Sequence, residues 1–446
     1  MNGAECFIFR PSLEFTTKDL RKLCFSLRDE AIEPQSIYMQ NRSCLIVAPI
    51  QHTGMGTQGY YWTRHLLPKL QAAGFEVNVA PNGDLNRQEL ATGSPHLLDQ
   101  KLQQALKPIN HGFGNPAFSI LLCLPAQFDQ MPGEQVIAYI IFEGSRLRKE
   151  DCLHLQRAQH IAVASQWAKE IVIQSFQFHG LPFSGQIFIW PEGVDADLYQ
   201  PQSDLNPASG PLAVQDAVTF VNVGKFEIRK GQSILVNAFA EMKIPEGKSL
   251  RLLGHWANYW NAEWMKQAIE LLRAEGFAKE IPIPNFPLKR FVHSSSDRKY
   301  VDLLTGHLAS SDQMLCIYRA ADFGIYPYFS EAWNLPLIET LACGVPCAAT
   351  AYSGPMEFLN KTPSWFLRKG KMVEARDTFG FQSGEDGEWM IPSAEELKGV
   401  MEEMSLLSVE ERSQRGWKSS KVVRTYFSWE ASAQKTFEDL RSHFSG

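Results

Sequence analysis

Two glutamates eight residues apart carry the clearest chemical signal in this sequence. Glu331 precedes Pro336 and Glu339 follows it, and Pro336 stands where the first residue of a helix is expected. The free N–H groups of Asn334 and Leu335 at such a helix start would bind an anion such as a phosphate. Carboxylates on either side of a bound phosphate could accept hydrogen bonds, one from a hydroxyl group of a sugar and the other from a hydroxyl group of a ribose. The alternative is a solvated Glu331, with Glu339 complementing the helix dipole.

A second candidate site is the basic turn VGKFEIRKG at residues 223–231. It follows a predicted strand over residues 218–223 and carries Lys225, Arg229 and Lys230 within six residues. Cations at the carboxyl end of a strand would point into a cleft, where they could neutralise a diphosphate with help from the dipole of the next helix. The alternative is a solvated basic turn.

A third candidate is GMGTQG at residues 54–59, which matches G-x-G-x-x-G between a strand and a helix. Dinucleotide binding requires the first glycine at the strand end and an acidic residue closing the second strand. Here four residues separate Pro49 from Gly54, and the first carboxylate after the second strand is Asp84. We therefore favour a loop whose N–H groups approach a phosphate or an acceptor, with a plain turn before a helix as the alternative.

The elements that must position these residues are short apolar runs alternating with helical segments. The runs mostly lack polar alternation, as parallel strands covered on both faces require. The pattern restarts after residues 200–216, an aperiodic proline-rich linker. It predicts two βαβ domains, with ligands in the cleft between them. The predicted strands are 44–49, 76–80, 119–124, 136–142, 160–164, 186–190, 218–223, 249–253, 322–326 and 347–349.

Composition narrows the function classes. The chain has 446 residues, 44% hydrophobic and 21% charged, with a net charge of -6, which is typical of a globular protein. No global basic field exists to hold nucleic acid. Eight scattered cysteines without metal-ligand spacing favour a reducing cytoplasm. The D-x-D at Asp195 and Asp197, which precedes the linker, favours a structural turn over a metal site.

Three ordered segments, VGKFEIRKG, SEAWNLPLIETLACGVP and TAYSGPMEF, resemble the C-terminal half of retaining glycosyltransferases of the large family 4. The pattern E-x7-E from Glu331 to Glu339 is the signature of that class. HIAVASQWAKE, WPEGVDADLY and FSWE also match, so the resemblance covers Leu45 to the C-terminus. It implies an α/β fold of GT-B architecture, in which two Rossmann-like doubly wound domains face each other across a cleft.

The resemblance implies a division of the chain into four parts. Residues 1–40 are an N-terminal extension of unknown role, and residues 41–205 form an acceptor-side Rossmann-like domain. Residues 206–420 form the domain that binds the nucleotide sugar. Residues 421–446 are a C-terminal helix that packs back toward the N-terminal domain.

Matching residues receive roles from the same resemblance. Lys225 and Lys230 correspond to the Arg/Lys pair that holds the donor diphosphate, although Lys225 stands where many members have arginine. Lysine keeps the charge there but loses the bidentate geometry. Glu331 corresponds to the carboxylate that binds the donor sugar, and Glu339 to the one that binds the ribose.

The remaining site residues are less direct matches. Asn334 and Leu335 supply backbone N–H groups to the phosphates, with Asn334 replacing a common glycine. Gly54 and Gly56 correspond to the glycine loop near the diphosphate and acceptor. The usual histidine motif of the N-terminal domain is absent, and FEGSR at residues 142–146 takes its place. Glu143 is therefore the candidate for a catalytic or sugar-positioning role on that side.

The implied reaction is transfer of a sugar from a nucleoside-diphosphate sugar to a hydroxyl of a glycan, lipid-linked or small-molecule acceptor. We expect a front-face mechanism with no metal and no cofactor, in a cytoplasmic protein that contacts the inner membrane face at most peripherally. The alternatives are a nucleotide-sugar hydrolase, phosphorylase or epimerase, a non-catalytic nucleotide-sugar-binding scaffold and, least favoured, a dehydrogenase. The sequence does not specify the base, sugar, acceptor, linkage or oligomeric state.

Overall fold

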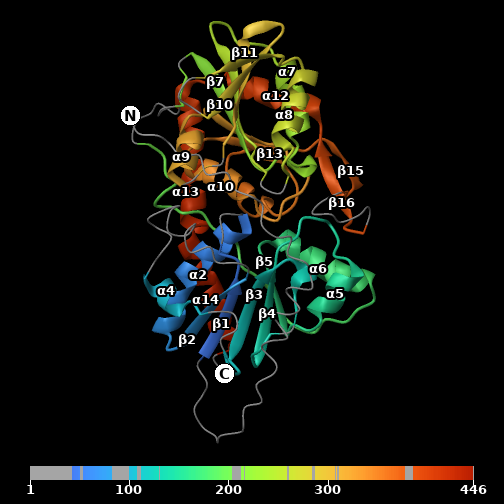
Figure 1. The fold of residues 1–446 in the computed structure, drawn as a ribbon, viewed down its shortest axis with the longest axis vertical. Helices are drawn as coiled ribbons and strands as arrows, with labels where there is room; N and C mark the ends of the chain where they lie inside the picture. Colours follow the sequence, from blue (N-terminus) through green and yellow to red (C-terminus); the bar gives the residue numbers. More distant parts are fainter. Residues whose placement is uncertain are drawn as a thin grey trace, which may run out of the picture.

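The structure is a computed structural model. It describes residues 43–50, 54–82, 100–107, 112–129, 131–202, 212–214, 216–258, 261–283, 287–306, 308, 311–376 and 385–444. The extension expected over residues 1–40 lies outside the described residues, as does most of the predicted linker at residues 200–216. Within the described part, a parallel sheet in one half of the molecule and a mainly parallel sheet in the other dominate (Figure 1).

The first sheet has six parallel strands in the order β2-β1-β3-β4-β5-β6. Helices cover both of its faces, which explains why its strands are apolar on both sides. One face packs against α2, α4 and the C-terminal α14, and the other against α5 and α6. The strands are β1 (Ser43–Ala48), β2 (Glu76–Pro81), β3 (Phe118–Cys123), β4 (Gln135–Ile140), β5 (His160–Val163) and β6 (Ile187–Ile189).

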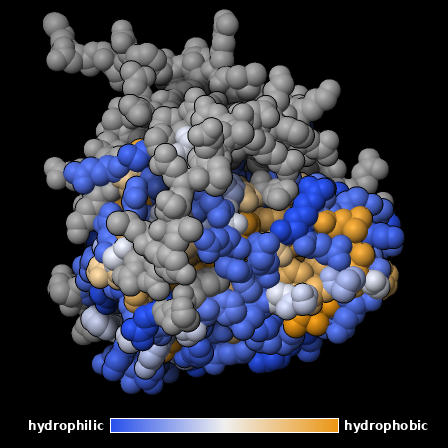
Figure 2. All heavy atoms as spheres, turned by 90° about the horizontal axis from the view of Figure 1, so that it is seen from below, coloured by the Kyte–Doolittle hydropathy of each residue, from blue (hydrophilic) through white to orange (hydrophobic). Residues whose placement is uncertain are grey.

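The helices of this half are α2 (Gly54–Ala72), α4 (Gln100–Ala105), α5 (Lys149–Leu155) and α6 (Gln166–Phe178), with a short 3-10 turn η1 (Pro125–Gln127). Figure 2 shows this half from below, where hydrophilic side chains form most of the coloured surface and hydrophobic ones gather toward one side. The exposed large hydrophobic residues of α5 and α6 are Leu153, Ile173 and Phe178.

The second sheet has eight strands in the order β14-β13-β12-β7-β8-β11-β10-β9. Six strands are parallel, and a hairpin-like extension adds the antiparallel β10 and β9 at one edge. The strands are β7 (Ala217–Val223), β8 (Ser249–His255), β9 (Lys279–Pro282), β10 (Leu288–His293), β11 (Ser296–Leu304), β12 (Phe323–Tyr326), β13 (Cys347–Thr350) and β14 (Trp365–Leu367). The fold class expected from the sequence is confirmed.

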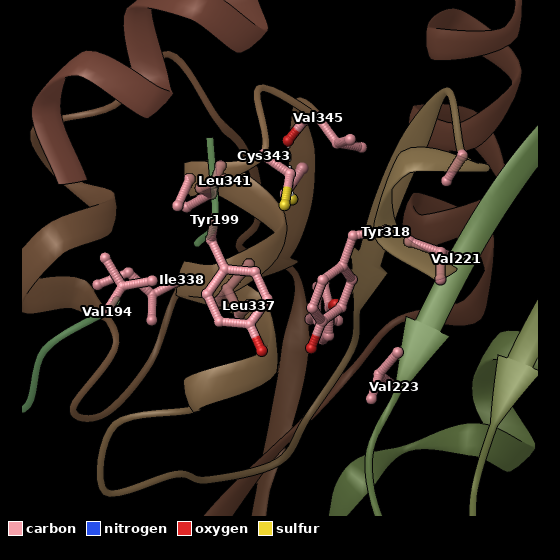
Figure 3. Packing of buried hydrophobic residues seen from close by; sticks show 14 of the residues in the cluster. Val194, Tyr199, Val221, Val223, Tyr318, Leu337, Ile338, Leu341, Cys343 and Val345 are labelled. Carbon is pink, nitrogen blue, oxygen red and sulfur yellow. Dashed lines mark hydrogen bonds between the residues drawn. The ribbon is translucent and has the colours of Figure 1, made fainter. Parts of the chain in front are cut away.

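The second sheet is also covered on both faces. One face packs against α7 (Gln232–Glu241), α8 (Trp264–Ala274) and α12 (Ala394–Ser405). The other packs against α9 (Ser311–Arg319), α10 (Leu335–Ala342) and α13 (Val409–Tyr426). Figure 3 shows this second core, in which Leu337, Ile338 and Leu341 of α10 lie near Tyr199 and Tyr318.

The chain crosses back to the first half at its C-terminal end. Helix α14 (Trp429–Phe444) lies beside α2, as the red and blue helices of Figure 1 show. The Trp62 indole donates a hydrogen bond to Thr436 at 3.2 Å, and the Tyr61 ring stacks on Trp429 at 5.9 Å. These contacts bury α14 in the core of the first half, so that half depends on the last helix of the chain.

The remaining antiparallel ribbon, β15 (Gly370–Glu374) with β16 (Glu388–Pro392), extends from the second half toward the first. It contacts the loop after β4, where the Arg146 N–H bonds to the Asp386 carbonyl at 3.1 Å and the Glu388 N–H to the Ser145 hydroxyl at 2.7 Å. No apolar periodicity in the sequence predicts this ribbon. Its contacts hold the loop that follows β4.

Candidate functional site

Glu331 lies in the loop between β12 and α10, and a second loop fixes its backbone. The Glu331 N–H donates to the Ser353 hydroxyl at 2.9 Å, and the Glu331 carbonyl accepts from the Gly354 N–H at 3.0 Å. A Cβ on Gly354 would collide with the carbonyl oxygen of Ala332, so glycine is required for this approach. The Ser-Gly-Pro segment downstream of Glu331 therefore sets the position of the carboxylate.

The basic turn is held against the same loop. It forms the short 3-10 helix η2 (Ile228–Lys230), which ends at Gly231 with φ at 73°. A Cβ on Gly231 would collide with the carbonyl oxygen of Pro327, and the Phe329 N–H donates to the Arg229 carbonyl at 2.7 Å. These backbone contacts bring two segments about 100 positions apart into one site.

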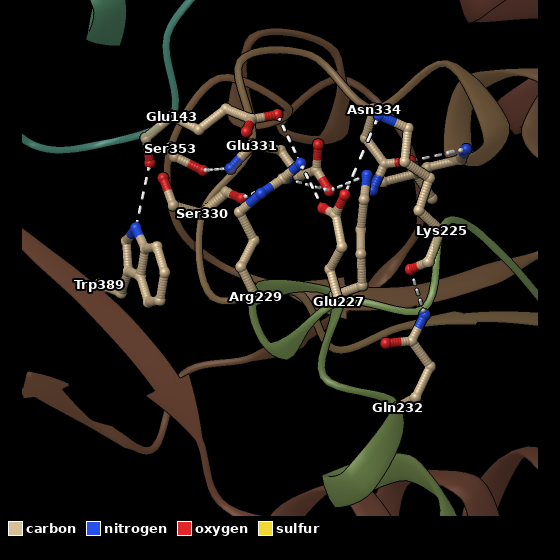
Figure 4. Close-up of polar contacts among 12 residues, drawn as sticks. Glu143, Lys225, Glu227, Arg229, Gln232, Ser330, Glu331, Asn334, Ser353 and Trp389 are labelled. Carbon is tan, nitrogen blue, oxygen red and sulfur yellow. Dashed lines mark hydrogen bonds and ion pairs between the residues drawn. The ribbon is translucent and has the colours of Figure 1, made fainter. Parts of the chain in front are cut away.

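The charged side chains of the two loops form a compact network (Figure 4). Lys230 Nζ lies 2.5 Å from the Glu331 carboxylate, and Arg229 Nη1 lies 3.0 Å from it. Arg229 Nη2 also pairs with Glu143 at 2.7 Å and with Glu227 at 3.2 Å. Because Glu143 belongs to the first half, this arginine joins the two halves through ion pairs.

The protonation of these groups follows from their neighbours. Burial opposes ionisation of Glu331, but Arg229 and Lys230 outweigh it and lower the pKa of Glu331 below its ordinary value. Burial likewise disfavours the charge on Arg229, yet Glu143, Glu331 and Glu227 raise its pKa. Burial dominates at Glu143 and, with Glu331 beside it, raises the pKa of Glu143 to about 7 despite Arg229.

Glu143 is positioned by the β15–β16 ribbon. The Trp389 indole of β16 donates to the Glu143 carbonyl at 3.3 Å, and Trp389 itself is buried against Phe329. The sequence singled out Glu143 as the candidate in place of a histidine. The structure brings it to Arg229 at the same loop junction as Glu331 and Lys230, with the buried Glu143 Oε2 lacking a hydrogen-bond partner among the described residues.

The start of α10 lies next to this network, and Figure 4 shows Asn334 beside it. Asn334 is the N-cap, with φ at 75°, and its side chain accepts from the Leu337 N–H at 3.2 Å. The helix begins at Leu335, so Pro336 is its second residue and not its first; the prediction for Pro336 was wrong by one position. Asn334 accounts for the shift, because its side chain caps the helix one residue earlier.

Glu339 lies farther along α10 in a different environment. Its carboxylate accepts a hydrogen bond from the Tyr318 hydroxyl of α9 at 2.6 Å. Burial raises the pKa of Glu339 to about 8, with Asp195 contributing in the same direction and Tyr318 opposing. No cation pairs with Glu339 among the described residues. The two glutamates of the motif therefore do not share partners.

Lys225 lies at the edge of the network. Its amine is 3.9 Å from the Glu227 carboxylate, and its carbonyl accepts from the Gln232 side chain at 2.8 Å. Burial lowers the pKa of Lys225, while Glu227 and Glu143 act to raise it. The lysine is thus close to the other cations without pairing directly with Glu331.

The glycines of GMGTQG lie in the first turns of α2. Gly54 is exposed, and a Cβ added to it would meet open space, whereas Gly56 is buried. The strict requirement falls on Gly59, where a Cβ would collide with the Pro49 carbonyl oxygen. Close packing of the helix on the end of β1 explains that third glycine, and the roles of Gly54 and Gly56 toward a ligand stay predictions.

Sequence reasoning missed the importance of two charged residues at this junction. Arg229 is visible in the sequence as one of three cations but receives no individual role there, because its burial and its pairing with Glu143 depend on the tertiary structure. Glu192 belongs to the matched segment WPEGVDADLY, yet nothing in that pattern marks it. It is 5% exposed, and its charge environment includes Glu331, Glu143 and Lys230.

The D-x-D segment forms a turn, since the Asp195 carboxylate accepts from the N–H groups of Asp197 and Leu198 at 3.1 and 3.0 Å. The described residues contain no cluster of three or more His, Cys, Asp or Glu side chains arranged to hold a metal ion. Over the same residues, no helix is both long enough and apolar enough to span a membrane.

Residues 217–382 match the family model for Glycosyl transferases group 1. This segment contains the basic turn, the Glu331 loop and helix α10. A D-inositol 3-phosphate glycosyltransferase from Geodermatophilus obscurus is 30% identical over 190 residues, which are 42% of this chain and 36% of that relative. The chain therefore aligns with about a third of the length of this curated glycosyltransferase.

Solved structures resemble nearly the whole chain in fold. The sucrose-phosphate synthase of Thermosynechococcus elongatus has a TM-score of 0.58 at 16% identity, covering 91% of this chain and 99% of that one. Anabaena HepE, solved with UDP and glucose, has a TM-score of 0.59 at 13% identity, covering 90% and 100%. The two sheets thus form the GT-B architecture, and residues 217–382 of its second half match the glycosyl transferases group 1 model.

Proposed function

We propose that this chain is a retaining glycosyltransferase that moves a sugar from a nucleoside-diphosphate sugar to a hydroxyl acceptor without a metal ion. The observation that carries the proposal is the junction of Lys230 and Arg229 with Glu331, at the start of α10 and against Glu143 of the other half. The cations and the helix start at this junction could bind the diphosphate, and the carboxylates could accept hydrogen bonds from the sugar hydroxyls. The family match over residues 217–382 supports the same conclusion.

The donor diphosphate would lie against Lys225 and Lys230 and the start of α10. Within the described residues, the N–H groups of Asn334 and Leu335 have no hydrogen-bond acceptor, so they are available to phosphate oxygens. Anabaena HepE has the same fold and was solved with UDP and glucose, which supports a nucleotide sugar as the ligand. Glu331 would accept hydrogen bonds from donor-sugar hydroxyls, and Glu339 from the ribose.

The proposed step exchanges one bond for another at the anomeric carbon. The bond from that carbon to the leaving phosphate oxygen breaks, and a bond to the acceptor oxygen forms on the same face. The acceptor proton passes to the leaving phosphate oxygen, so atoms and charges balance. Lys230 and the α10 dipole stabilise the charge that develops on the leaving group, a contribution that grows in a water-poor cleft.

Glu143 would act on the acceptor side of the cleft. Its pKa of about 7 leaves it partly protonated at neutral pH, so its carboxyl group is able both to donate and to accept hydrogen bonds. Its pairing with Arg229 places it close to the loops that would hold the donor. A hydroxyl group of the acceptor also both donates and accepts hydrogen bonds, so it could pair with Glu143 in either protonation state. The proposal does not specify the acceptor further.

The first experiment is calorimetric titration of UDP, GDP and ADP into the wild-type protein and into Lys230→Ala. We expect one nucleotide to bind, with clearly weaker binding to the variant because a charge-assisted contact to the diphosphate is lost. Lys266→Ala is the matched control, since Lys266 is an exposed lysine on α8 whose amine is 3.7 Å from Glu263. It should bind as the wild type does.

The outcomes separate the candidate functions. Binding that Lys230→Ala does not weaken would overturn the assignment of the diphosphate site. Release of nucleoside diphosphate from the sugar nucleotide without an added acceptor would identify a hydrolase instead of a transferase. Binding without turnover toward any hydroxyl acceptor would favour a scaffold that keeps the nucleotide pocket.

A further inference from the structure

A third carboxyl group lies at this junction, and the proposed transfer reaction assigns it no role. Glu192 follows β6, at the carboxyl edge of the first sheet, which is the same edge that presents Glu143 after β4. It is 5% exposed. Within the described residues its carboxylate has no ion-pair or hydrogen-bond partner.

The backbone around Glu192 is held firmly on both sides. Before it, the Trp190 carbonyl accepts from the Tyr139 hydroxyl at 2.6 Å. After it, the Val194 N–H donates to the Phe427 carbonyl at 2.9 Å, where the C-terminal segment crosses between the halves. These two contacts fix the backbone on either side of Glu192.

Charged and titratable groups surround Glu192 from each neighbouring element. They are Tyr139 of β4, Glu143 after β4, Lys230 of η2 and Glu331 before α10. Burial raises the pKa of Glu192 to about 8, Glu331 and Glu143 act in the same direction, and Lys230 opposes them. The carboxyl group is therefore mainly neutral at pH 7, and a neutral carboxyl group donates a hydrogen bond as well as accepting one.

Glu192 is 5% exposed, so its carboxyl group has lost most of its contact with water, and no described side chain or backbone group replaces that contact by a hydrogen bond. Such a group is accounted for when a ligand supplies the missing partner. Glu192 lies near both Lys230, assigned to the diphosphate, and Glu331, assigned to the donor sugar. The ligand nearest to it would therefore be the sugar diphosphate at the bond that breaks.

We propose that Glu192, buried at the carboxyl edge of the first sheet, is a further substrate-binding residue, whose carboxyl group donates a hydrogen bond to an oxygen atom of the bound sugar diphosphate. This inference rests on the proposed function, since it needs a sugar nucleotide in the cleft. It goes beyond that function by adding a proton-bearing donor to a site otherwise described by lysines and backbone N–H groups. Neutrality matters, because a carboxylate at the same place would repel the diphosphate.

Donor affinity should then depend on pH. Below about pH 8 Glu192 keeps its proton and donates, and above it the ionised group repels the ligand. One proton required for binding raises the dissociation constant about tenfold between pH 7 and pH 9 for a group that titrates at the midpoint. The pKa of Glu143 is raised to about 7 and that of Lys225 is lowered, so the comparison must be made against a variant that lacks only the Glu192 proton.

The test is calorimetric titration at pH 7, 8 and 9 of wild type, Glu192→Gln and Asp197→Asn. The ligands are UDP, GDP and ADP, followed by UDP-glucose, GDP-glucose or ADP-glucose according to the base that binds. Glutamine keeps the size and the donor but does not ionise. Asp197 is an exposed residue of the same segment and serves as the control. Thermal unfolding checks that the variants fold.

We expect the ratio of the wild-type to the Glu192→Gln dissociation constant to rise about tenfold from pH 7 to pH 9, and the Asp197→Asn ratio to stay constant. If this ratio already rises with the nucleoside diphosphate as ligand, the contact is to the phosphate. If it rises only with the sugar nucleotide, the contact is to the sugar. A constant Glu192→Gln ratio, with binding still dependent on Lys230, overturns this inference and leaves the proposed function intact.

A second measurement needs no ligand. The infrared difference spectrum between wild type and Glu192→Gln at pH 7 should contain the carbonyl band of a protonated carboxylic acid, and that band should disappear by pH 10. Absence of the band at pH 7 overturns the inference, because the group would then be ionised. If no nucleotide binds to the wild type at any pH, the proposed function fails, and the inference fails with it, whatever the infrared result.

Discussion

Glu331 and Glu339 belong to one sequence motif, and the structure gives them opposite electrostatic environments. Glu331 is paired with Lys230 at 2.5 Å and Arg229 at 3.0 Å, and these cations lower its pKa. Glu339 has the neutral Tyr318 hydroxyl as its partner at 2.6 Å, and burial raises its pKa to about 8. The first is a carboxylate at neutral pH, and the second is largely a carboxylic acid.

The difference shows that burial alone does not decide the charge of a glutamate. Glu331 is buried and Glu339 is partly buried, and the loss of water disfavours the ionised form of each. What separates them is whether the fold brings a cation within contact distance. The basic turn faces the loop that carries Glu331, whereas a turn into α10 the side chain of Glu339 meets α9 and its tyrosine. Variants that disturb one of these two environments at a time should therefore differ in how much they change stability or turnover, and in the direction of their pH dependence.

Removing the central cation should have the largest effect. Arg229→Ala leaves Glu143, Glu227 and Glu331 without a shared partner, and breaking a buried ion pair from one side costs on the order of 3–5 kcal/mol. Chemical denaturation at pH 7 measures the loss in free energy of unfolding. Arg376→Ala is the control, because Arg376 is an exposed arginine paired with Glu374. Equal stabilities of the two variants would mean that the network does not hold the halves together.

The ion pair between Lys230 and Glu331 should control turnover. Lys230→Ala and Glu331→Ala should each lower kcat by a factor on the order of 10²–10³, since a preorganised charged group at the reacting bond is lost. The rate of nucleoside diphosphate release in the presence of acceptor measures it, and circular dichroism checks the fold. A folded variant that turns over within a few-fold of wild type would remove that residue from the site.

The two glutamates should respond to pH in opposite ways. Glu339 titrates near pH 8 when folded and near 4.5 ordinarily, so its proton favours the folded state and stability declines as pH rises from about 4.5 to about 8. Glu339→Gln should remove this decline, which one proton limits to about 1.4 kcal/mol per pH unit. Glu331, with its lowered pKa, stabilises the fold above its ordinary value of 4.5 and loses that effect as pH falls through its folded pKa.

Denaturation curves collected at intervals from about pH 4 to about pH 9 test both halves of this prediction. Glu331→Gln should lose stability mainly toward neutral pH, where the wild-type carboxylate is ionised and paired. Identical pH profiles for Glu331→Gln and Glu339→Gln would show that their environments do not differ as described.

The smallest effect is expected at Tyr318. Its hydroxyl lowers the pKa of Glu339 against burial, so Tyr318→Phe should raise that pKa further and shift the pH-dependent decline of stability upward. The lost hydrogen bond should cost about 1 kcal/mol. Tyr426→Phe is the control, since Tyr426 is exposed. A pH midpoint that moves downward would contradict the assigned direction.

Much of the fold was predictable because its strands are buried on both faces. The six predicted strands of the first half appear within two residues of their observed bounds, from β1 (Ser43–Ala48) to β6 (Ile187–Ile189). In the second half, the antiparallel β9 and β10 and the parallel β11 and β14 were missed. Polar and exposed residues such as those of Lys279–Pro282 in β9 give no strong apolar signal. The β15–β16 ribbon escaped prediction for a similar reason, with few buried positions in Gly370–Glu374.

For the candidate site, spacing located Lys230 and Glu331, because a strand end followed by a loop and a helix start is a local pattern. Arg229 was visible as a cation, but its burial between two halves of the molecule was not. Glu192 left no pattern at all, since a glutamate in a turn is ordinarily solvated. What made it unusual is the crossing of the C-terminal segment over Val194, a contact between positions more than 200 residues apart.

Short stretches of chain were sufficient to define the two βαβ halves, the positions of the basic turn and the E-x7-E motif, and the helix start between its glutamates. These features depend on apolar periodicity and on local backbone preferences. Which carboxyl groups are charged depended instead on contacts between distant parts of the chain. Glu331 is ionised because a loop about 100 residues earlier brings it two cations. Glu339 and Glu192 keep protons because the fold removes much of their water at places where no cation of the described residues pairs with them.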